Sequence, residues 1–124
     1  MKYSNLKIGQ GCPQEVNAFI EISMDSHPIK YEFDQEMKTM VLDRFMRLSM
    51  QYPCNYGFIP CTISGDKDPL DILVYSTHPI AMQSIIAVKP IGVLLTEDES
   101  GTDEKILSVP ILKVDPYFKN INNY

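Results

Sequence analysis

The sequence lacks a long apolar run, and this absence limits where the protein can reside. Its longest uninterrupted apolar stretch, residues 91–95 (IGVLL), is far too short to cross a bilayer. Residues 1–6 lack the apolar core of a secretory signal peptide. We therefore expect a cytoplasmic protein that has no membrane partner.

Cysteines are few and do not form a recognisable framework. The three present, Cys12, Cys54 and Cys61, are odd in number and show no CxxC spacing. This pattern argues against a disulfide scaffold and against a thiolate zinc site. It is typical of a protein kept in a reducing compartment.

Basic residues are also scarce. Eleven Lys and Arg face sixteen Asp and Glu, which gives a net charge of -5. Proteins that follow a nucleic-acid backbone are normally basic, so we expect no nucleic-acid partner. Residues 66–104 hold eight of the acidic residues and only two of the basic ones. This acidic stretch is a candidate cation site, and the rest of the chain supplies most of the positive charge.

The chain shows no repeat, low-complexity tract or Gly/Ser linker, so 124 residues predict one domain over 1–124. Scattered prolines and glycines disfavour long helices. Alternating or β-branched residues predict strands over 16–24, 29–34, 40–45, 70–75, 84–96 and 106–109, with a bend or a bulge near Pro90 and Gly92. The fold class expected is mainly β: a small closed five-stranded antiparallel barrel with extra strands and little helix.

The densest chemical signal is DKDPLDI, residues 66–72. Asp66, Asp68 and Asp71 lie within six residues, and two ionised carboxylates about 5 Å apart repel by roughly 3 kcal/mol at an effective dielectric of about 20. A divalent cation would relieve this repulsion. Carboxylates without His or Cys favour Mg²⁺, Mn²⁺ or Ca²⁺ over zinc. An EF-hand is excluded, because Asp71 and Thr77 stand where that loop needs Gly and Glu. A solvated acidic turn is the alternative.

A second acidic segment, residues 97–105 (EDESGTDEK), follows a strongly apolar strand. We expect it to form a loop at the rim of the barrel. Alone, such a segment is more often a plain solvated loop. Together with residues 66–72, it offers oxygen ligands for more than one metal ion.

Cationic and phenolic side chains complete a possible phosphate site. Lys30 and Glu32 share one face of an alternating strand, and Arg44 lies among apolar neighbours in VLDRFM. Arg44 either binds a ligand or pairs with a carboxylate such as Asp43. A tyrosine of the turn-rich segment 51–58 (QYPCNYGF) either packs or reaches a ligand. Such donors facing carboxylates that hold Mg²⁺ would bind phosphate oxygens.

Several segments of the sequence, taken in order, resemble the soluble family I inorganic pyrophosphatases of the bacterial type. The segments are IEIS, PIKYEFD, VLDRFM, YPCNYGFIP, DKDPLDILV, KPIGVLLTEDESGTDEKILSVP and VDPYFKNINN. DKDPLDI matches the family signature D-x-D-P-x-D, with Lys67 where the family usually has a small or acidic residue. The resemblance runs from about Val16 to the last residue.

This resemblance implies an oligonucleotide-fold barrel that hydrolyses pyrophosphate to two phosphates with several Mg²⁺ ions, for which Mn²⁺ is a possible substitute. It also implies a homo-oligomer, a hexamer in the bacterial family. Asp68 matches the base for the attacking water. The metal ligands implied are Asp66, Asp68, Asp71, Asp98 and Asp103, the phosphate contacts are Lys30, Arg44, Tyr56 and Lys105, and Glu21 and Glu32 line the cavity.

The resemblance further implies a C-terminal segment with a helix and an H-Y-K-x-L-type motif. The sequence given contains no such motif. Two expectations therefore stand side by side. One is a pyrophosphatase domain that lacks the family's C-terminal helix; the alternative is a truncated remnant, inactive or weakly active, that binds Mg²⁺ and phosphate without efficient turnover.

Overall fold

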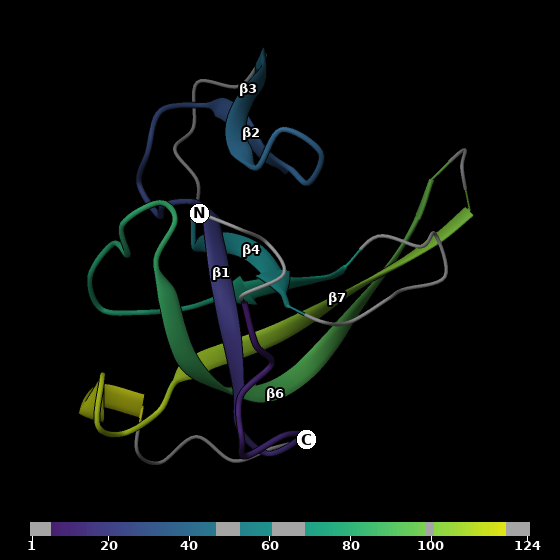
Figure 1. The fold of residues 1–124 in the computed structure, drawn as a ribbon. Coiled ribbons are helices and arrows are strands. Elements are labelled where there is room, and N and C mark those ends of the chain that lie inside the picture. The colour runs from purple at the N-terminus through teal and green to yellow at the C-terminus, as the bar shows by residue number, and fades with distance from the viewer. Residues whose placement is uncertain (1–5, 47–52, 61–68, 99–100, 119–124) are drawn as a thin grey trace.

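The computed structural model describes residues 6–46, 53–60, 69–98 and 101–118, and these residues are almost entirely strands and turns (Figure 1). No helix among them is long and apolar enough to span a membrane. The one short helical turn described is η2. The elements are β1 (Val16–Ile22), β2 (Ile29–Asp34), β3 (Thr39–Phe45), β4 (Asn55–Ile59), β5 (Leu70–Val74), β6 (Ile85–Asp98), β7 (Gly101–Pro110) and η2 (Pro116–Phe118).

Five strands close into a barrel in the order β1-β4-β5-β7-β6, with β6 pairing back to β1. The predicted five-stranded barrel is thus confirmed. Four of its pairings are antiparallel, whereas β5 and β7 run parallel. The expectation of a wholly antiparallel barrel is wrong for a geometric reason. An odd number of strands cannot alternate direction around a closed ring, so at least one neighbouring pair must be parallel.

The barrel interior is filled by branched aliphatic side chains. On β1 every second residue points inward, as the period-2 pattern of a strand requires. Burying this cluster on folding provides the main driving force for closing the barrel. Its buried members are Val16, Ala18, Ile20, Ile59, Ile72, Val74, Ile86 and Val88.

A second, smaller core lies outside the barrel. The rings of Phe19 on β1 and Phe58 on β4 contact at a tilt of 33° with centroids 5.0 Å apart, and Phe33 of β2 meets Phe19 edge-on at 5.4 Å. Strands β2 and β3 pair with each other as a separate two-stranded sheet. We call this β2–β3 hairpin the arm. The phenylalanine cluster thus packs the arm onto β1 and β4. In Figure 1 the arm lies at the top of the view, above β1 and β4.

Strand β4 falls in the segment that the sequence suggested was turn-rich. Gly57 pairs with Ile20 of β1, and a Cβ at position 57 would lie 2.8 Å from the Phe19 carbonyl carbon and closer still to its oxygen. The glycine therefore permits a close approach of two backbones, which a strand interior rarely needs. The strand was missed because its turn-forming residues serve tertiary packing.

Among the described residues, a register shift of the β-bulge kind interrupts three of the strand ladders. The register of β1 against β4 skips Glu21, that of β3 against β2 skips Asp43, and that of β6 against β7 skips Ile91. The last confirms the bulge expected near Pro90 and Gly92. A bulge inserts one unpaired residue and redirects its side chain, and bulges are common beside functional sites. Two of these three unpaired residues are carboxylic acids.

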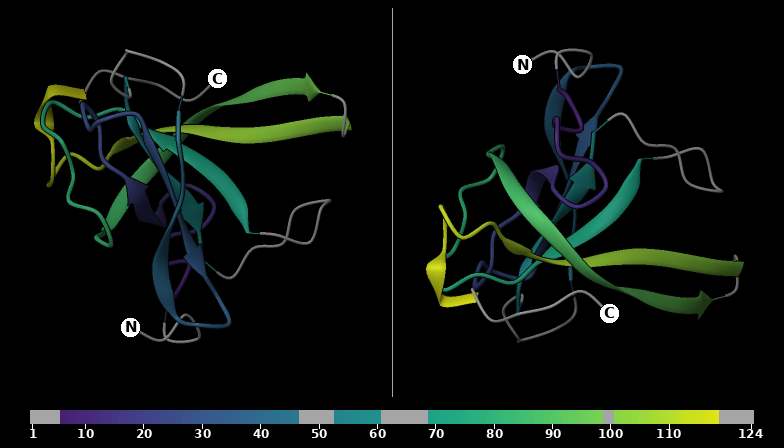
Figure 2. Two further views of the ribbon diagram at one scale, coloured as in Figure 1. Left: turned by 90° about the horizontal axis from the view of Figure 1, so that it is seen from above. Right: turned by 90° about the horizontal axis from the view of Figure 1, so that it is seen from below.

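Strands β6 and β7 continue beyond the barrel as a two-stranded ribbon (Figure 2). Their pairing extends from the barrel to Asp98 opposite Gly101. The expectation of a loop over residues 97–105 is therefore wrong, because only residues 99–100 lie between the strands. Both faces of this ribbon are exposed to solvent, so charged residues are tolerated at every position. Its sequence therefore lacks the alternating apolar pattern by which a half-buried strand is predicted.

Candidate functional site

A cavity of about 250 Å³ lies between the arm and the outer surfaces of β1, β4 and β5. The arm contributes one wall, with Phe33 beneath it, and Pro69 and Phe58 contribute apolar surface on the barrel side. Polar groups of both charges dominate the rest of the wall. Five of the residues singled out from the sequence line this one cavity: Glu21, Lys30, Glu32, Tyr56 and Asp71.

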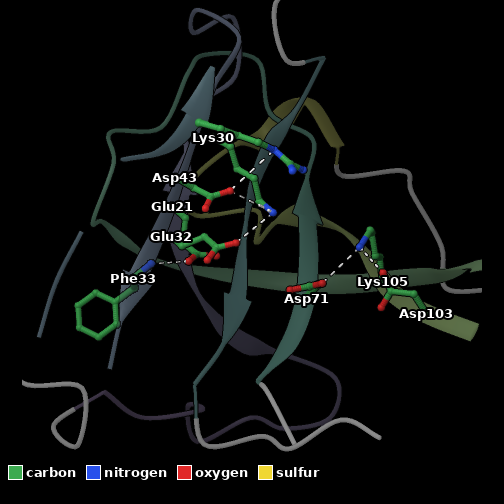
Figure 3. Close-up of polar contacts among 9 residues, drawn as sticks. Glu21, Lys30, Glu32, Phe33, Asp43, Asp71, Asp103 and Lys105 are labelled. Carbon is green, nitrogen blue, oxygen red and sulfur yellow. Dashed lines mark hydrogen bonds and ion pairs between the residues drawn. The ribbon is translucent and has the colours of Figure 1, made fainter. Parts of the chain in front are cut away.

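Glu21 occupies the bulge of β1 and joins the barrel to the arm. Its Oε2 accepts a hydrogen bond of 2.9 Å from the backbone N–H of Phe33 (Figure 3). Burial, helped by the nearby carboxylates of Asp71 and Glu32, raises the pKa of Glu21 to about 7, although the bond from Phe33 and the charge of Lys30 oppose the shift. At neutral pH this carboxyl is therefore poised between its acid and its anion.

We expect Glu21→Gln to stabilise the protein at alkaline pH in a chelating buffer. Because the folded-state pKa of Glu21 lies above its usual 4.5, the folded state binds the extra proton. Stability should therefore fall as pH rises through the window from 4.5 to about 7. Glutamine removes this loss and can still accept the bond from Phe33, so we expect a gain of about 2 kcal/mol at pH 8 and little change at pH 4.5.

Urea unfolding at the two pH values measures this difference. Glu32→Gln is the matched control, because the Glu32 side chain is 55% exposed and should give no comparable gain. Equal stability of Glu21→Gln and the wild type at pH 8 would contradict the assignment.

On the arm, one lysine is placed between two carboxylates. The Lys30 ammonium lies 3.0 Å from Glu32 Oε1 and 3.9 Å from Asp43 Oδ2, and Arg44 Nε lies 3.8 Å from the same Asp43 oxygen (Figure 3). For Arg44, the pairing with Asp43 is the alternative that the structure realises. Arg44 does not line the 250 Å³ cavity, and its side chain is 63% exposed.

A second charged group lies on neighbouring barrel strands. Asp71 on β5 stands opposite Lys105 on β7, and the lysine Nζ lies 3.3 Å from Asp71 Oδ2 and 2.6 Å from Asp103 Oδ2. The same Nζ is 5.5 Å from the centre of the Tyr56 ring. Figure 3 shows Lys105 between the two acids, across from the Glu21 and Lys30 group. The ammonium thus holds two carboxylates and a tyrosine together.

The electrostatics of this group follow from burial and pairing. Burial alone would lower the pKa of Lys105, but hydrogen bonds to Asp103 and Tyr56 and the charge of Asp71 raise it overall, so the lysine stays charged. Burial raises the pKa of Tyr56, although its bond to Lys105 opposes this. Tyr56 therefore remains a neutral hydroxyl, available as a hydrogen-bond donor.

The donor set suits a hard divalent cation, but the described residues supply only part of a coordination sphere. They include no group of three or more His, Cys, Asp or Glu residues arranged to hold a metal ion. Asp66 and Asp68 lie outside the described residues, and Asp98 ends β6 with its side chain outside the description. Of the five carboxylates expected to hold a metal, the structure describes the side chains of Asp71 and Asp103, and carboxylate oxygens are the ligands that Mg²⁺ prefers.

The sequence alone predicts no part in the site for two groups that the structure places there. It offers Asp43 only as a possible partner of Arg44, yet Asp43 lies near Lys30 as well. Phe33 reads as an ordinary core residue of an alternating strand, but its backbone N–H binds Glu21. The bulges that create both arrangements have no sequence signal of their own, since they depend on how two strands pair.

The fold and the site place the chain in the class of small closed five-stranded β-barrels that carry a charged cavity on the outer surface of the barrel. The family described as inorganic pyrophosphatase matches residues 18–124. The chain is 48% identical over 124 residues to the inorganic pyrophosphatase of Rhodospirillum rubrum and 56% identical over 107 residues to that of Rickettsia prowazekii. These matches cover 100% and 86% of this chain.

A solved structure shows the same fold. The crystal structure of an inorganic phosphatase from Anaplasma phagocytophilum superimposes with a TM-score of 0.91 and 52% identity, over 97% of this chain and 70% of that one. The chain belongs to the inorganic pyrophosphatase family. It spans 69% of the Rhodospirillum relative and 62% of the Rickettsia relative. Family membership supports a divalent metal ion as the cofactor in general.

Proposed function

We propose that this chain hydrolyses inorganic pyrophosphate to two phosphates in a Mg²⁺-dependent reaction. The observation that carries the proposal is the convergence of three acidic side chains, a lysine and a tyrosine on one cavity in a chain of this family. Pyrophosphate is a polyanion, so a site for it must neutralise several negative charges while leaving room for water. Lys30 and Tyr56 supply donors on the cavity wall, Lys105 lies against the Tyr56 ring, and a cation held by the carboxylates would supply the remaining positive charge.

The proposed roles follow the chemistry of each side chain. Lys30, Tyr56 and Lys105 donate to phosphate oxygens from two walls of the site, and Arg44 extends the cationic surface along the arm. Mg²⁺, when bound, supplies positive charge that screens the phosphates and makes water more acidic. The carboxylates proposed to hold it are Asp66, Asp68, Asp71, Asp98 and Asp103.

Asp68 is proposed to orient the attacking water and accept its proton. Water then adds its oxygen to one phosphorus, the bridging P–O bond breaks, and the second phosphate leaves. Little covalent chemistry is asked of the protein, because phosphoryl transfer depends mainly on positioning and on charge neutralisation. Glu21 and Glu32 fix the cavity wall around these groups.

Phosphate release from pyrophosphate with Mg²⁺ tests the proposal directly. We expect turnover by the wild type, loss of turnover in a chelator, and a decrease of at least about 100-fold in Asp68→Asn, since a positioned general base contributes about 10² to 10⁴. Asp115→Asn is a suitable control, because Asp115 binds Thr77 and Tyr117 away from the cavity. Metal-dependent thermal stabilisation without turnover would instead favour a chain that binds Mg²⁺ and phosphate only.

We also propose a homo-oligomer that acts in the cytoplasm without nucleic acid. Large apolar side chains exposed on both hairpins support association: Phe45 is 72% exposed, and Val93 and Leu95 are 56% and 64% exposed. Light scattering coupled to size exclusion measures the assembly, and salt-sensitive binding to single-stranded DNA would contradict the absence of a nucleic-acid partner.

A further inference from the structure

Asn55 is a fully buried polar residue whose side-chain amide makes four hydrogen bonds. Its Oδ1 accepts hydrogen bonds from the backbone N–H of Met24 (2.9 Å) and Ile80 (3.0 Å). Its Nδ2 donates to the Val74 carbonyl (3.0 Å) and to Ser76 Oγ (2.8 Å). An amide that makes two donor and two acceptor bonds without water is costly to replace and rigid in place.

These bonds join the barrel to the segment that leads into the arm. Met24 lies in the connection between β1 and β2, and Ile80 lies in the connection after β5. A further bond closes the loop, because Ser23 Oγ donates to the Ile80 carbonyl at 2.5 Å. Asn55 thus holds the base of the arm. Farther along the arm, Phe33 is held by its bond to Glu21 and by packing in the phenylalanine cluster.

The arm has few other attachments. Its two strands form a ladder with each other and pair with no barrel strand among the described residues, although the Phe33 N–H donates to the Glu21 side chain of β1. It nevertheless carries Lys30 and Glu32, which must face Tyr56 and Asp71 across the cavity. Whatever fixes the base of the arm therefore helps to set the width of the site, together with the contacts of Phe33 with Glu21 and the phenylalanine cluster.

We infer that Asn55 is a positioning residue, which sets the distance between the arm and the barrel wall by holding Met24. Successive residues of a strand point to opposite faces. Asn55 thus lies on one face of β4 and holds the base of the arm, while Tyr56 on the other face enters the cavity. The consequence of this coupling for catalysis rests on the proposed function; the mechanical role does not.

The turn at Met24 allows one hydrogen bond to be removed cleanly. Residues 23–26 form a turn in which the Ser26 N–H donates to the Ser23 carbonyl, and Asp25 at its third position has φ 63°. Turns with a positive φ at the third position favour proline at the second. Met24→Pro therefore suits the turn while deleting the N–H that Asn55 binds.

Two variants separate this bond from its surroundings. Met24→Ala shortens the same side chain but keeps the N–H. Ser76→Ala removes a different bond of Asn55, one that does not lead to the arm. The three proteins together thus distinguish loss of the Met24 bond from loss of side-chain packing or of general stability.

Hydrogen exchange of the backbone amides of β2 and β3, measured in a chelating buffer, reads the position of the arm without requiring activity. We expect exchange there to be about 2- to 10-fold faster in Met24→Pro than in Met24→Ala, the scale expected for one hydrogen bond. Ser76→Ala should leave the arm unchanged. Equal exchange in the proline and alanine variants, or equal acceleration in Ser76→Ala, would overturn the inference.

Steady-state hydrolysis of Mg²⁺-pyrophosphate then tests the catalytic consequence. Misplacing Lys30 relative to Tyr56 should raise KM for Met24→Pro by about 3- to 10-fold over Met24→Ala, with a smaller change in kcat. An unchanged KM beside faster exchange would refute a role in substrate binding. If the wild type releases no phosphate, the proposed function fails, whereas the exchange measurement still decides whether Asn55 positions the arm.

Discussion

Gly57→Ala is expected to destabilise the protein more than a glycine-to-alanine substitution at any other glycine that the structure describes. A Cβ at this position would lie 2.8 Å from the Phe19 carbonyl carbon and 3.1 Å from the Ile20 Cα. Both are backbone atoms of the neighbouring strand, so no side-chain rotation can relieve the clash. Strands β1 and β4 would have to separate, and their separation would disturb the barrel closure between them.

The expected cost is about 3 kcal/mol or more, at the upper end for overpacking, because the backbone itself must shift. This is a large part of the stability of a small domain, which is typically about 5–15 kcal/mol. Urea unfolding and the yield of soluble protein measure the effect. Glu21 and Tyr56 flank the clash on the two strands, so any folded remainder should also lose the geometry of the cavity.

Gly92→Ala provides the matched control. A Cβ at position 92 would meet only Leu107 Cδ1, at an ordinary contact distance of 3.7 Å. We expect its stability to stay within about 0.5 kcal/mol of the wild type. If the two glycine variants were equally stable, the close approach of β1 and β4 could not be the reason for Gly57.

The strands that the sequence predicted well are those whose pattern is local. Residues 29–34 alternate strictly, and β2 has these bounds; residues 70–75 differ from β5 by a single residue. Strand β4 was missed because Asn55 and Gly57 favour turns as isolated residues. In the fold, Asn55 is a buried side chain with several hydrogen bonds, and Gly57 allows two backbones to come into contact. Neither reason exists before the barrel closes, so tertiary context overrides local preference.

The residues of the candidate site also fall into two groups, those with a local sequence signal and those without one. The carboxylates of residues 66–71 stand out by density alone, since like charges so close in sequence require an explanation. Glu21 carries no such signal, and only the resemblance to a family singled it out. Glu21 points into the cavity because it is the unpaired residue at the bulge between β1 and β4. Such a bulge depends on how the two strands pair and not on either strand alone. Sequence chemistry thus singles out candidate ligands, whereas strand pairing determines which of these side chains meet.

Lys105→Met is expected to reduce turnover of pyrophosphate by about 10³-fold, at the upper end for removal of one donor that stabilises developing charge. The lysine is proposed to contact phosphate, but it also neutralises two carboxylates at 2.6 and 3.3 Å. Methionine fills a similar volume without charge. The variant therefore loses a phosphate contact and leaves Asp71 and Asp103 without their shared counter-ion, so both binding and chemistry should suffer.

Lys105→Arg and Lys113→Met separate these causes. Arginine keeps the charge but changes the shape of the donor, so it should retain more activity than methionine. Lys113 is exposed on the chain after β7, and its loss should leave turnover close to that of the wild type. Initial rates of phosphate release across a range of Mg²⁺ concentrations make the comparison.

A thermal unfolding series distinguishes a counter-ion from a simple substrate contact. Without the ammonium, Asp71 and Asp103 repel each other, and Lys105→Met should melt at a lower temperature than the wild type in a chelating buffer. Because a divalent cation can take over the neutralisation, added Mg²⁺ should raise the melting temperature of the variant more than that of the wild type. Equal melting temperatures in chelator, together with a loss of turnover, would show that Lys105 serves the substrate alone and that the carboxylates need no internal counter-charge.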